Sequence, residues 1–99
     1  MRLTQSQIDV IKQKTLLVFG DSAKVYLFGS RIDDLAKGGD IDLFIELNQL
    51  TECAVLKTLQ LNSELQQAFG LQKIDILFYA PNYAWQTIYS IAKEQGVLL

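Results

Sequence analysis

Three aspartates in this sequence have the spacing and the neighbours that metal chemistry requires. Asp40 and Asp42 open one apolar run with a single residue between them, and Asp75 interrupts a later apolar run. Alternate residues of a strand point to the same face, so Asp40 and Asp42 would share a face about 6.6 Å apart. Two carboxylates at that spacing can hold one hard cation or a pair of them. Because an unpaired buried carboxylate is costly, Asp75 also predicts a metal or a hydrogen-bond donor beside it.

The hydrophobic pattern predicts the helices and strands that would position these residues. We expect helices over residues 4–19, 51–69 and 82–95, and strands over residues 25–28, 40–47 and 73–79. Thr51 and Asn82 are the expected N-caps of the second and third helices. The second helix is expected to present an imperfect apolar face made of Val55, Leu59, Leu61, Leu65 and Phe69. Gly96 ends the last helix and leaves Val97-Leu98-Leu99 as an apolar tail, a candidate docking surface.

This order of elements predicts an α/β (α+β) fold with a small mixed sheet of about three main strands flanked by helices. The 99 residues suit one domain, residues 1–99. A helix joins the strands of residues 40–47 and 73–79, so a right-handed parallel crossover is expected between them. That crossover would gather Asp40, Asp42 and Asp75 at one end of the sheet. If strand 25–28 runs antiparallel to strand 40–47, its end at Gly29 lies there too.

Composition excludes several kinds of protein. The chain has no histidine, which removes Ser-His-Asp and Cys-His catalysis and disfavours a zinc site. Its only cysteine is Cys53, and the formal net charge is −2 with no Lys/Arg cluster, so nucleic acid is disfavoured as a partner. No apolar run reaches the ~20 residues of a membrane span, and no signal-peptide pattern is present. We therefore expect a soluble, cytoplasmic protein; the sequence leaves a homo-oligomer open.

Taken together, these motifs resemble the nucleotidyltransferase superfamily of DNA polymerase beta. The resemblance rests on Gly29-Ser30 at a strand end, nine residues, Asp40-Ile41-Asp42 opening the next strand, and Asp75 on a later strand. It implies transfer of an NMP unit from an NTP to a hydroxyl with release of pyrophosphate. Asp40 and Asp42 would bridge two Mg²⁺ ions, and Asp75 would hold the ion that activates the acceptor and could receive its proton.

The same resemblance gives roles to the glycine–serine turn. The backbone amides after Gly29 and the Ser30 hydroxyl would cradle the β- and γ-phosphates of the nucleotide, with ATP as the expected substrate. Arg31 could pair with phosphate bidentately. Taken singly, Ser30 is more often a helix cap, Arg31 a surface residue, and Asp40 and Asp42 solvated charges. The joint pattern raises the active-site interpretation above these alternatives.

At this size the chain looks most like the minimal nucleotidyltransferases, which are typically encoded beside a HEPN-domain protein, several pairs being toxin–antitoxin systems. The leading hypothesis is therefore an antitoxin that modifies a hydroxyl of a HEPN-type partner. Three alternatives stay open: a non-catalytic module that neutralises its partner by masking it, a transferase with a small-molecule acceptor, and a structural Mg²⁺ or Ca²⁺ site. Tyr83, Trp85 and Tyr89 are expected in the core rather than as a base-stacking platform.

Overall fold

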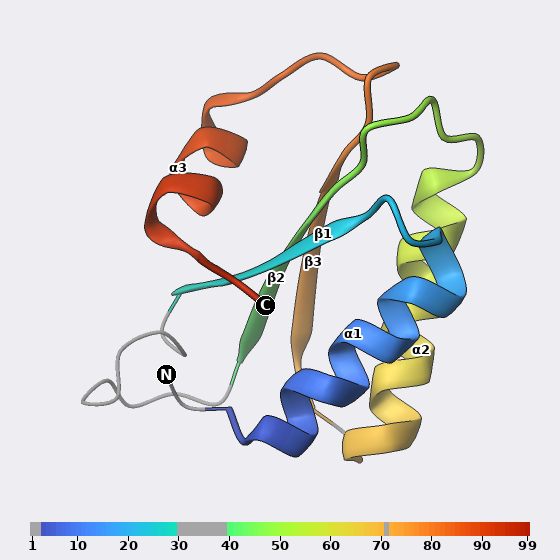
Figure 1. The fold of residues 1–99 in the computed structure, drawn as a ribbon, viewed down its shortest axis with the longest axis vertical. Coiled ribbons are helices and arrows are strands. Elements are labelled where there is room, and N and C mark those ends of the chain that lie inside the picture. The colour runs from blue at the N-terminus through green and yellow to red at the C-terminus, as the bar shows by residue number, and fades with distance from the viewer. Residues whose placement is uncertain (1–2, 30–39, 71) are drawn as a thin grey trace.

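A computed structural model describes residues 3–29, 40–70 and 72–99 of the chain (Figure 1). The elements, in chain order, are α1 (Gln5–Phe19), β1 (Lys24–Phe28), β2 (Ile41–Glu46), α2 (Ala54–Phe69), β3 (Ile74–Tyr79), α3 (Thr87–Gln95) and β4 (Val97–Leu98). Three helices and a mixed sheet confirm the predicted fold class. Ser30 and Arg31, which were predicted to bind phosphate, lie outside the described residues. None of the helices in the described part is long and apolar enough to cross a membrane.

The strands form one sheet in the order β3-β2-β1-β4. β2 and β3 are parallel, as the helical crossover predicted, and β1 is antiparallel to β2. The C-terminal residues were predicted to form an apolar tail, and this prediction is wrong. They form β4, in which Val97 pairs with Leu27 and Leu98 with Tyr26, and the Leu99 amide donates to the Val25 carbonyl at 2.9 Å. Their backbone groups complete the edge of the sheet instead of trailing free.

The two faces of the sheet have separate cores. Ile41, Leu43 and Ile45 of β2 are fully buried on the face that α1 and α2 cover. Phe44, which points the other way, is buried against α3 together with Tyr89 and Ala92. Figure 1 shows α1 and α2 side by side on one side of the sheet and α3 on the other. The predicted alternation of β2 is therefore confirmed, and it leaves Asp42 on the α3 face.

The first helix begins as its sequence predicts. The Thr4 hydroxyl accepts from the Gln7 amide at 3.1 Å, and the Gln7 side chain accepts from the Thr4 amide at 2.9 Å, forming a capping box. Ile11, Thr15 and Val18 are buried on one face of the helix. Through this face α1 packs on the sheet that contains β1, the strand that follows α1 in the chain.

The starts of the other two helices differ from the prediction. α2 begins at Ala54, after Cys53, rather than at Thr51. α3 begins at Thr87, after Gln86, rather than at Asn82. The cause is a contact between two loops: the Asn82 side chain accepts from the Thr51 amide and donates to the Thr51 carbonyl, both at 3.3 Å. The Asn82 side chain is therefore engaged by the other loop, and the Thr51 hydroxyl donates to the Gln49 carbonyl at 3.0 Å, so neither side chain caps its predicted helix.

The apolar face of α2 is also narrower than predicted. Leu61 and Leu65 are fully buried, and Ala54 joins them. Val55 and Leu59, which were predicted to be part of that face, are 56% and 62% exposed. They belong to a stripe at helical spacing that turns away from the core.

Cys53 has a strained backbone conformation, and its replacement by glycine should stabilise the fold. Among the described residues it is the non-glycine residue with a positive φ, 57°, and its side chain makes no cap hydrogen bond. Glycine adopts this conformation without the Cβ penalty, so we expect Cys53→Gly to raise the free energy of unfolding by about 0.5–1 kcal/mol. Urea denaturation measures it. Cys53→Ala keeps the strain and is the control; a Cys53→Gly protein no more stable than Cys53→Ala would contradict this account.

Candidate active site

Three strands bring the predicted site residues to one end of the sheet. Asp42 is the register partner of Asp75 in the parallel β2–β3 pair and of Phe28 in the antiparallel β1–β2 pair. Gly29 follows Phe28 directly, and Asp40 precedes β2 by one residue. The strand order and directions thus place Gly29, Asp40, Asp42 and Asp75 together, as the crossover predicted. Their chemical roles stay predictions.

Gly29 lies against the carboxyl group of Asp42. Its φ is 75°, and a Cβ built on it would overlap Asp42 Oδ2 and lie 3.1 Å from Asp42 Cγ. No other residue type leaves this space or adopts this φ without strain. The glycine therefore lets the Asp42 carboxyl pack onto the backbone where β1 ends, which is where a phosphate group would also approach.

The Asp42 carboxyl is pushed towards its neutral form. Partial burial raises its pKa, and the negative charges of Asp75 and Asp40, together with hydrogen bonding to the Asp75 side chain, raise it further. Lys73 opposes this effect more weakly. Close carboxyl groups that repel one another are relieved by a bound cation. A cation bound beside Asp42 would therefore offset the charges that raise its pKa.

Asp40 takes part in an ion pair that the sequence analysis missed. Its Oδ2 lies 3.6 Å from the Lys73 ammonium, and both side chains are well exposed. Such surface pairs contribute little to stability, so Asp40 can leave Lys73 at low cost. The signal was available: Lys73 precedes Ile74, the register partner of Ile41, so parallel pairing sets it beside Asp40.

Asp75 was predicted to be buried, and this prediction is wrong. Asp75 is exposed, although Ile74 beside it is buried. The physical reason is position: β3 is an edge strand, and α3 packs against Tyr26 and Phe44 rather than over the start of β3. Because Asp75 is exposed, water can solvate its charge and it needs no buried partner.

The aspartates at this end of the sheet are suitable ligands for a hard divalent cation, but they are not arranged as a complete binding site. Carboxylate oxygens are the ligands that Mg²⁺ takes, and Asp42 and Asp75 are register partners on neighbouring strands. Within the described residues, no group of three or more His, Cys, Asp or Glu side chains is arranged to hold a metal ion. Because Asp40 pairs with Lys73, it would have to turn towards Asp42 to complete the set.

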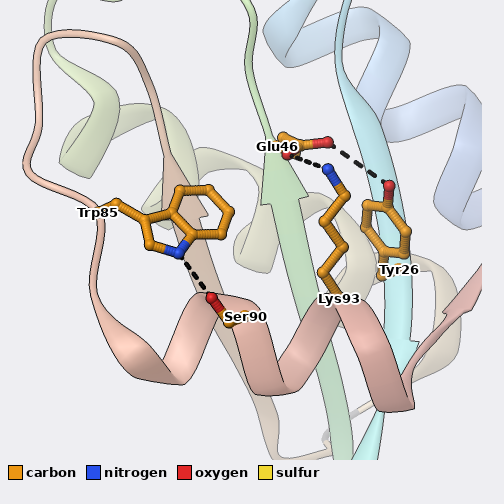
Figure 2. A network of polar contacts seen from close by, with 5 residues as sticks. All are labelled: Tyr26, Glu46, Trp85, Ser90 and Lys93. Carbon is orange, nitrogen blue, oxygen red and sulfur yellow. Dashed lines mark hydrogen bonds and ion pairs between the residues drawn. The ribbon is translucent and has the colours of Figure 1, made fainter.

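Glu46 shares a sheet face with Asp42 but belongs to another network. Its carboxylate accepts from Lys93 at 2.9 Å and from the Tyr26 hydroxyl at 3.5 Å (Figure 2). Burial and the Glu46 charge raise the pKa of Tyr26. This network fastens α3 to β1 and β2. Glu46 therefore has a structural role here.

The predicted aromatic core is partly exposed. Tyr89 is buried and stacks on Phe44 with ring centroids 5.4 Å apart. Trp85 lies edge-on to Tyr79 at 4.7 Å and donates to the Ser90 hydroxyl at 2.7 Å, yet 44% of it is exposed (Figure 2). Tyr83 is also exposed. The rings hold α3 in place, and two of the three predicted core aromatics reach the surface.

Fold and site together define a class of protein. A mixed sheet with paired acidic residues at the start of two parallel strands, and a glycine turn at the end of their antiparallel neighbour, suits metal-assisted transfer of a phosphate-bearing group. The family model for polymerase beta nucleotidyltransferases matches residues 8–99 of the chain. The chain therefore belongs to this family of nucleotidyltransferases, as the resemblance indicated. No curated protein sequence matches the chain.

The raised pKa of Asp42 makes stability depend on pH when no divalent metal is present. The folded state holds the Asp42 proton to a higher pH than the unfolded chain does, so the free energy of unfolding falls as pH rises from the unfolded pKa of aspartate through the raised folded one. We expect Asp42→Asn to lack this component in chelator-treated protein, measured by urea denaturation across that window. Asp21→Asn, an exposed change in a turn, is the control; equal pH slopes for wild type and Asp42→Asn would oppose the assignment.

Proposed function

We propose that this protein transfers AMP from ATP to a hydroxyl group on a partner protein. The observation that carries the proposal is the pairing of Asp42 with Asp75 at the sheet end where Gly29 closes on Asp42. Membership of the nucleotidyltransferase family supports the reaction type. The nucleotide, the acceptor and the metal are parts of the proposal.

The residues divide the chemistry between them. Asp40, Asp42 and Asp75 would hold two Mg²⁺ ions, which supply charge neutralisation of the triphosphate and activation of the acceptor hydroxyl. Asp75 accepts the proton of that hydroxyl. The acceptor oxygen then forms a bond to the α-phosphorus while the bond from the α-phosphorus to the bridging oxygen breaks, and pyrophosphate leaves.

The triphosphate would be held at the turn after β1. Gly29 gives the phosphates access to the backbone because it has no side chain. In this proposal Ser30 donates its hydroxyl and Arg31 its guanidinium to the β- and γ-phosphates. Phosphate contacts of this kind do not distinguish between bases, so the choice of ATP needs its own test.

The openness of the site supports a large acceptor. Asp75 is exposed, so a hydroxyl on a protein surface can reach it without entering a closed pocket. We propose a HEPN-domain protein encoded nearby as this acceptor, with the chain acting as the antitoxin of a toxin–antitoxin pair in the cytoplasm. Modification of the partner would be the means of neutralising it.

A second candidate function is neutralisation by binding alone. Leu16 and Leu17 of α1 are 55% and 66% exposed, next to each other on a helix. Exposed apolar side chains of this kind are typical of protein-binding surfaces. In this case the partner would be masked, and the carboxylates would be incidental.

One assay separates the two candidates. Wild type and Asp42→Ala are each incubated with α-labelled ATP and Mg²⁺, alone and with the HEPN-domain partner. Label on the partner with wild type and none with Asp42→Ala supports transfer to the partner. A stable complex with both proteins and no label on the partner would replace transfer by masking.

A further inference from the structure

The outer edge of β3 carries backbone groups without partners. In the β2–β3 pair the Ile41 amide donates to the Lys73 carbonyl and the Leu47 amide to the Tyr79 carbonyl. Backbone groups alternate in direction along a strand, so Lys73, Asp75, Leu77 and Tyr79 bond towards β2. The amides and carbonyls of Ile76 and Phe78 point outward, where the described part of the chain has no further strand.

Side chains of α2 cover the beginning of this edge. Asn62 donates to the outward carbonyl of Ile74 at 2.9 Å, and Gln66 bonds both the amide and the carbonyl of Gln72. Within residues 3–29, 40–70 and 72–99, no hydrogen bond serves the outward amides and carbonyls of Ile76 and Phe78. The exposed edge is therefore limited to these two outward residues and the Leu77 between them.

The stripe of α2 that carries Asn62 and Gln66 is polar at one end and apolar at the other. Val55, Leu59, Asn62 and Gln66 recur at helical spacing and share one side of the helix. Going back from Asn62 to Val55 covers about 10 Å of helix. Going forward from Ile74 to Leu77 covers about 10 Å of strand, and α2 runs opposite to β3. The exposed Val55 and Leu59 thus flank the uncovered edge.

From Ile76 to Phe78 the edge of β3 lacks the usual protection of an edge strand. Its sequence from Ile74 to Tyr79 contains no lysine and no proline, and its one charge is Asp75. A strand with these properties pairs readily with another extended chain. An extended chain supplies the alternating donors and acceptors that Ile76 and Phe78 need, and apolar side chains for Val55 and Leu59.

We propose that this edge binds β3 of a second copy, making a two-fold symmetric dimer with a continuous sheet. Ile76 and Phe78 are the uncovered outward residues, so antiparallel pairing matches Ile76 of one copy with Phe78 of the other and places the two Leu77 residues on the axis. This register joins a β-branched residue to an aromatic one on the α2 face, a favourable cross-strand pair.

The register also keeps the two Asp75 charges apart and brings the two α2 helices together. The two Asp75 residues lie about 13 Å apart along the strands instead of facing each other. Each Asp75 lies opposite Tyr79 of the other copy, so the second copy borders each candidate active site. The two α2 helices lie on the same face of the joined sheet, where the exposed Val55 and Leu59 stripes of both copies meet. A self-complementary patch of this kind is what a two-fold interface requires.

The oligomeric state tests the proposal. In analytical ultracentrifugation we expect wild type to form a dimer and the Val55→Lys/Leu59→Lys double variant to raise the dimer dissociation constant at least about 100-fold, because like charges meet across the axis. Leu17→Lys changes an equally exposed leucine on α1 and should leave the dimer intact. A monomeric wild type at concentrations up to about 1 mM, or a dimer no more sensitive to the double variant than to Leu17→Lys, would overturn the proposal.

A disulfide tests the register. In a Cys53→Gly background, Leu77→Cys places one thiol from each copy at a non-hydrogen-bonded pair, with Cα atoms about 4.5 Å apart, within disulfide range. Oxidation should give a covalent dimer on a non-reducing gel, whereas Asp75→Cys should not, because the two Asp75 positions are offset. A dimer that Leu77→Cys fails to crosslink would overturn this pairing. Neither readout depends on nucleotidyl transfer.

Discussion

Asp42→Asn should reduce nucleotidyl transfer by at least about 10³-fold while the fold stays intact or becomes more stable. The substitution removes the carboxylate that lies between Asp75 and Gly29 and that would bind both metal ions. Stability should not suffer without metal, because the charge of Asp42 is held against partial burial and two neighbouring carboxylates, which raise its pKa. Transfer of label from α-labelled ATP measures the first effect, and thermal unfolding with a chelator measures the second.

The effect of Mg²⁺ on the unfolding temperature tests whether Asp42 binds the metal. Mg²⁺ should raise the unfolding temperature of wild type, because a ligand that binds only the folded state stabilises it. Asp42→Asn should lose that increase, and Asp21→Asn should retain it. A Mg²⁺-dependent increase that survives in Asp42→Asn would remove this residue from the metal site, whatever its effect on transfer.

Gly29→Ala should lower transfer by about 10²-fold, because a displacement of roughly 1 Å at a reacting centre has an effect of that size. A Cβ at this position overlaps Asp42 Oδ2, so the carboxyl must move. The positive φ of 75° adds backbone strain. Together these should lower the free energy of unfolding by about 1–3 kcal/mol. Labelled ATP and urea denaturation measure the two effects.

A matched glycine separates strain from overlap. Gly70 has a φ of 81°, and a Cβ built on it meets nothing within 4 Å. Gly70→Ala therefore reports the backbone strain alone and should leave transfer unchanged. In an Asp42→Ala background the overlap with Oδ2 and Cγ disappears, so Gly29→Ala should then cost about as much as Gly70→Ala. If Gly29→Ala costs the same with and without the Asp42 carboxyl, the close approach has no energetic role.

The sequence predicted the sheet end well because short-range rules determine it. Alternation placed Ile41, Leu43 and Ile45 on one face of β2, and the helical connection required a parallel β3. These two facts bring Asp42 and Asp75 to the same end of the sheet, and the observed register makes them partners. The glycine at position 29 was expected to admit a phosphate, but its contact with Asp42 depends on the antiparallel β1–β2 pairing, which the sequence left conditional.

The errors arose where distant segments compete for local groups. Thr51 and Asn82 each have good capping chemistry, but their mutual hydrogen bonds join two loops that are far apart in the sequence. Asp75 was judged from its apolar neighbours, whereas its exposure is set by its place on an edge strand. The C-terminal tail was assigned no partner because strand pairing with β1 involves residues about seventy positions away.

Trp85 gives the protein a spectroscopic reporter of its own. It is the single tryptophan of the chain, and it lies edge-on to Tyr79 and Tyr89 at 4.7 and 5.5 Å. Tyr79 lies on β3, so energy transfer from Tyr79 to the indole should fall when the loop before α3 leaves the sheet, whereas transfer from Tyr89 continues because Tyr89 lies on α3 itself. Emission excited at tyrosine wavelengths, compared with emission excited at tryptophan alone, reads the docking of α3 without a label. Any partner that lifts α3 from Phe44 would be visible in that ratio.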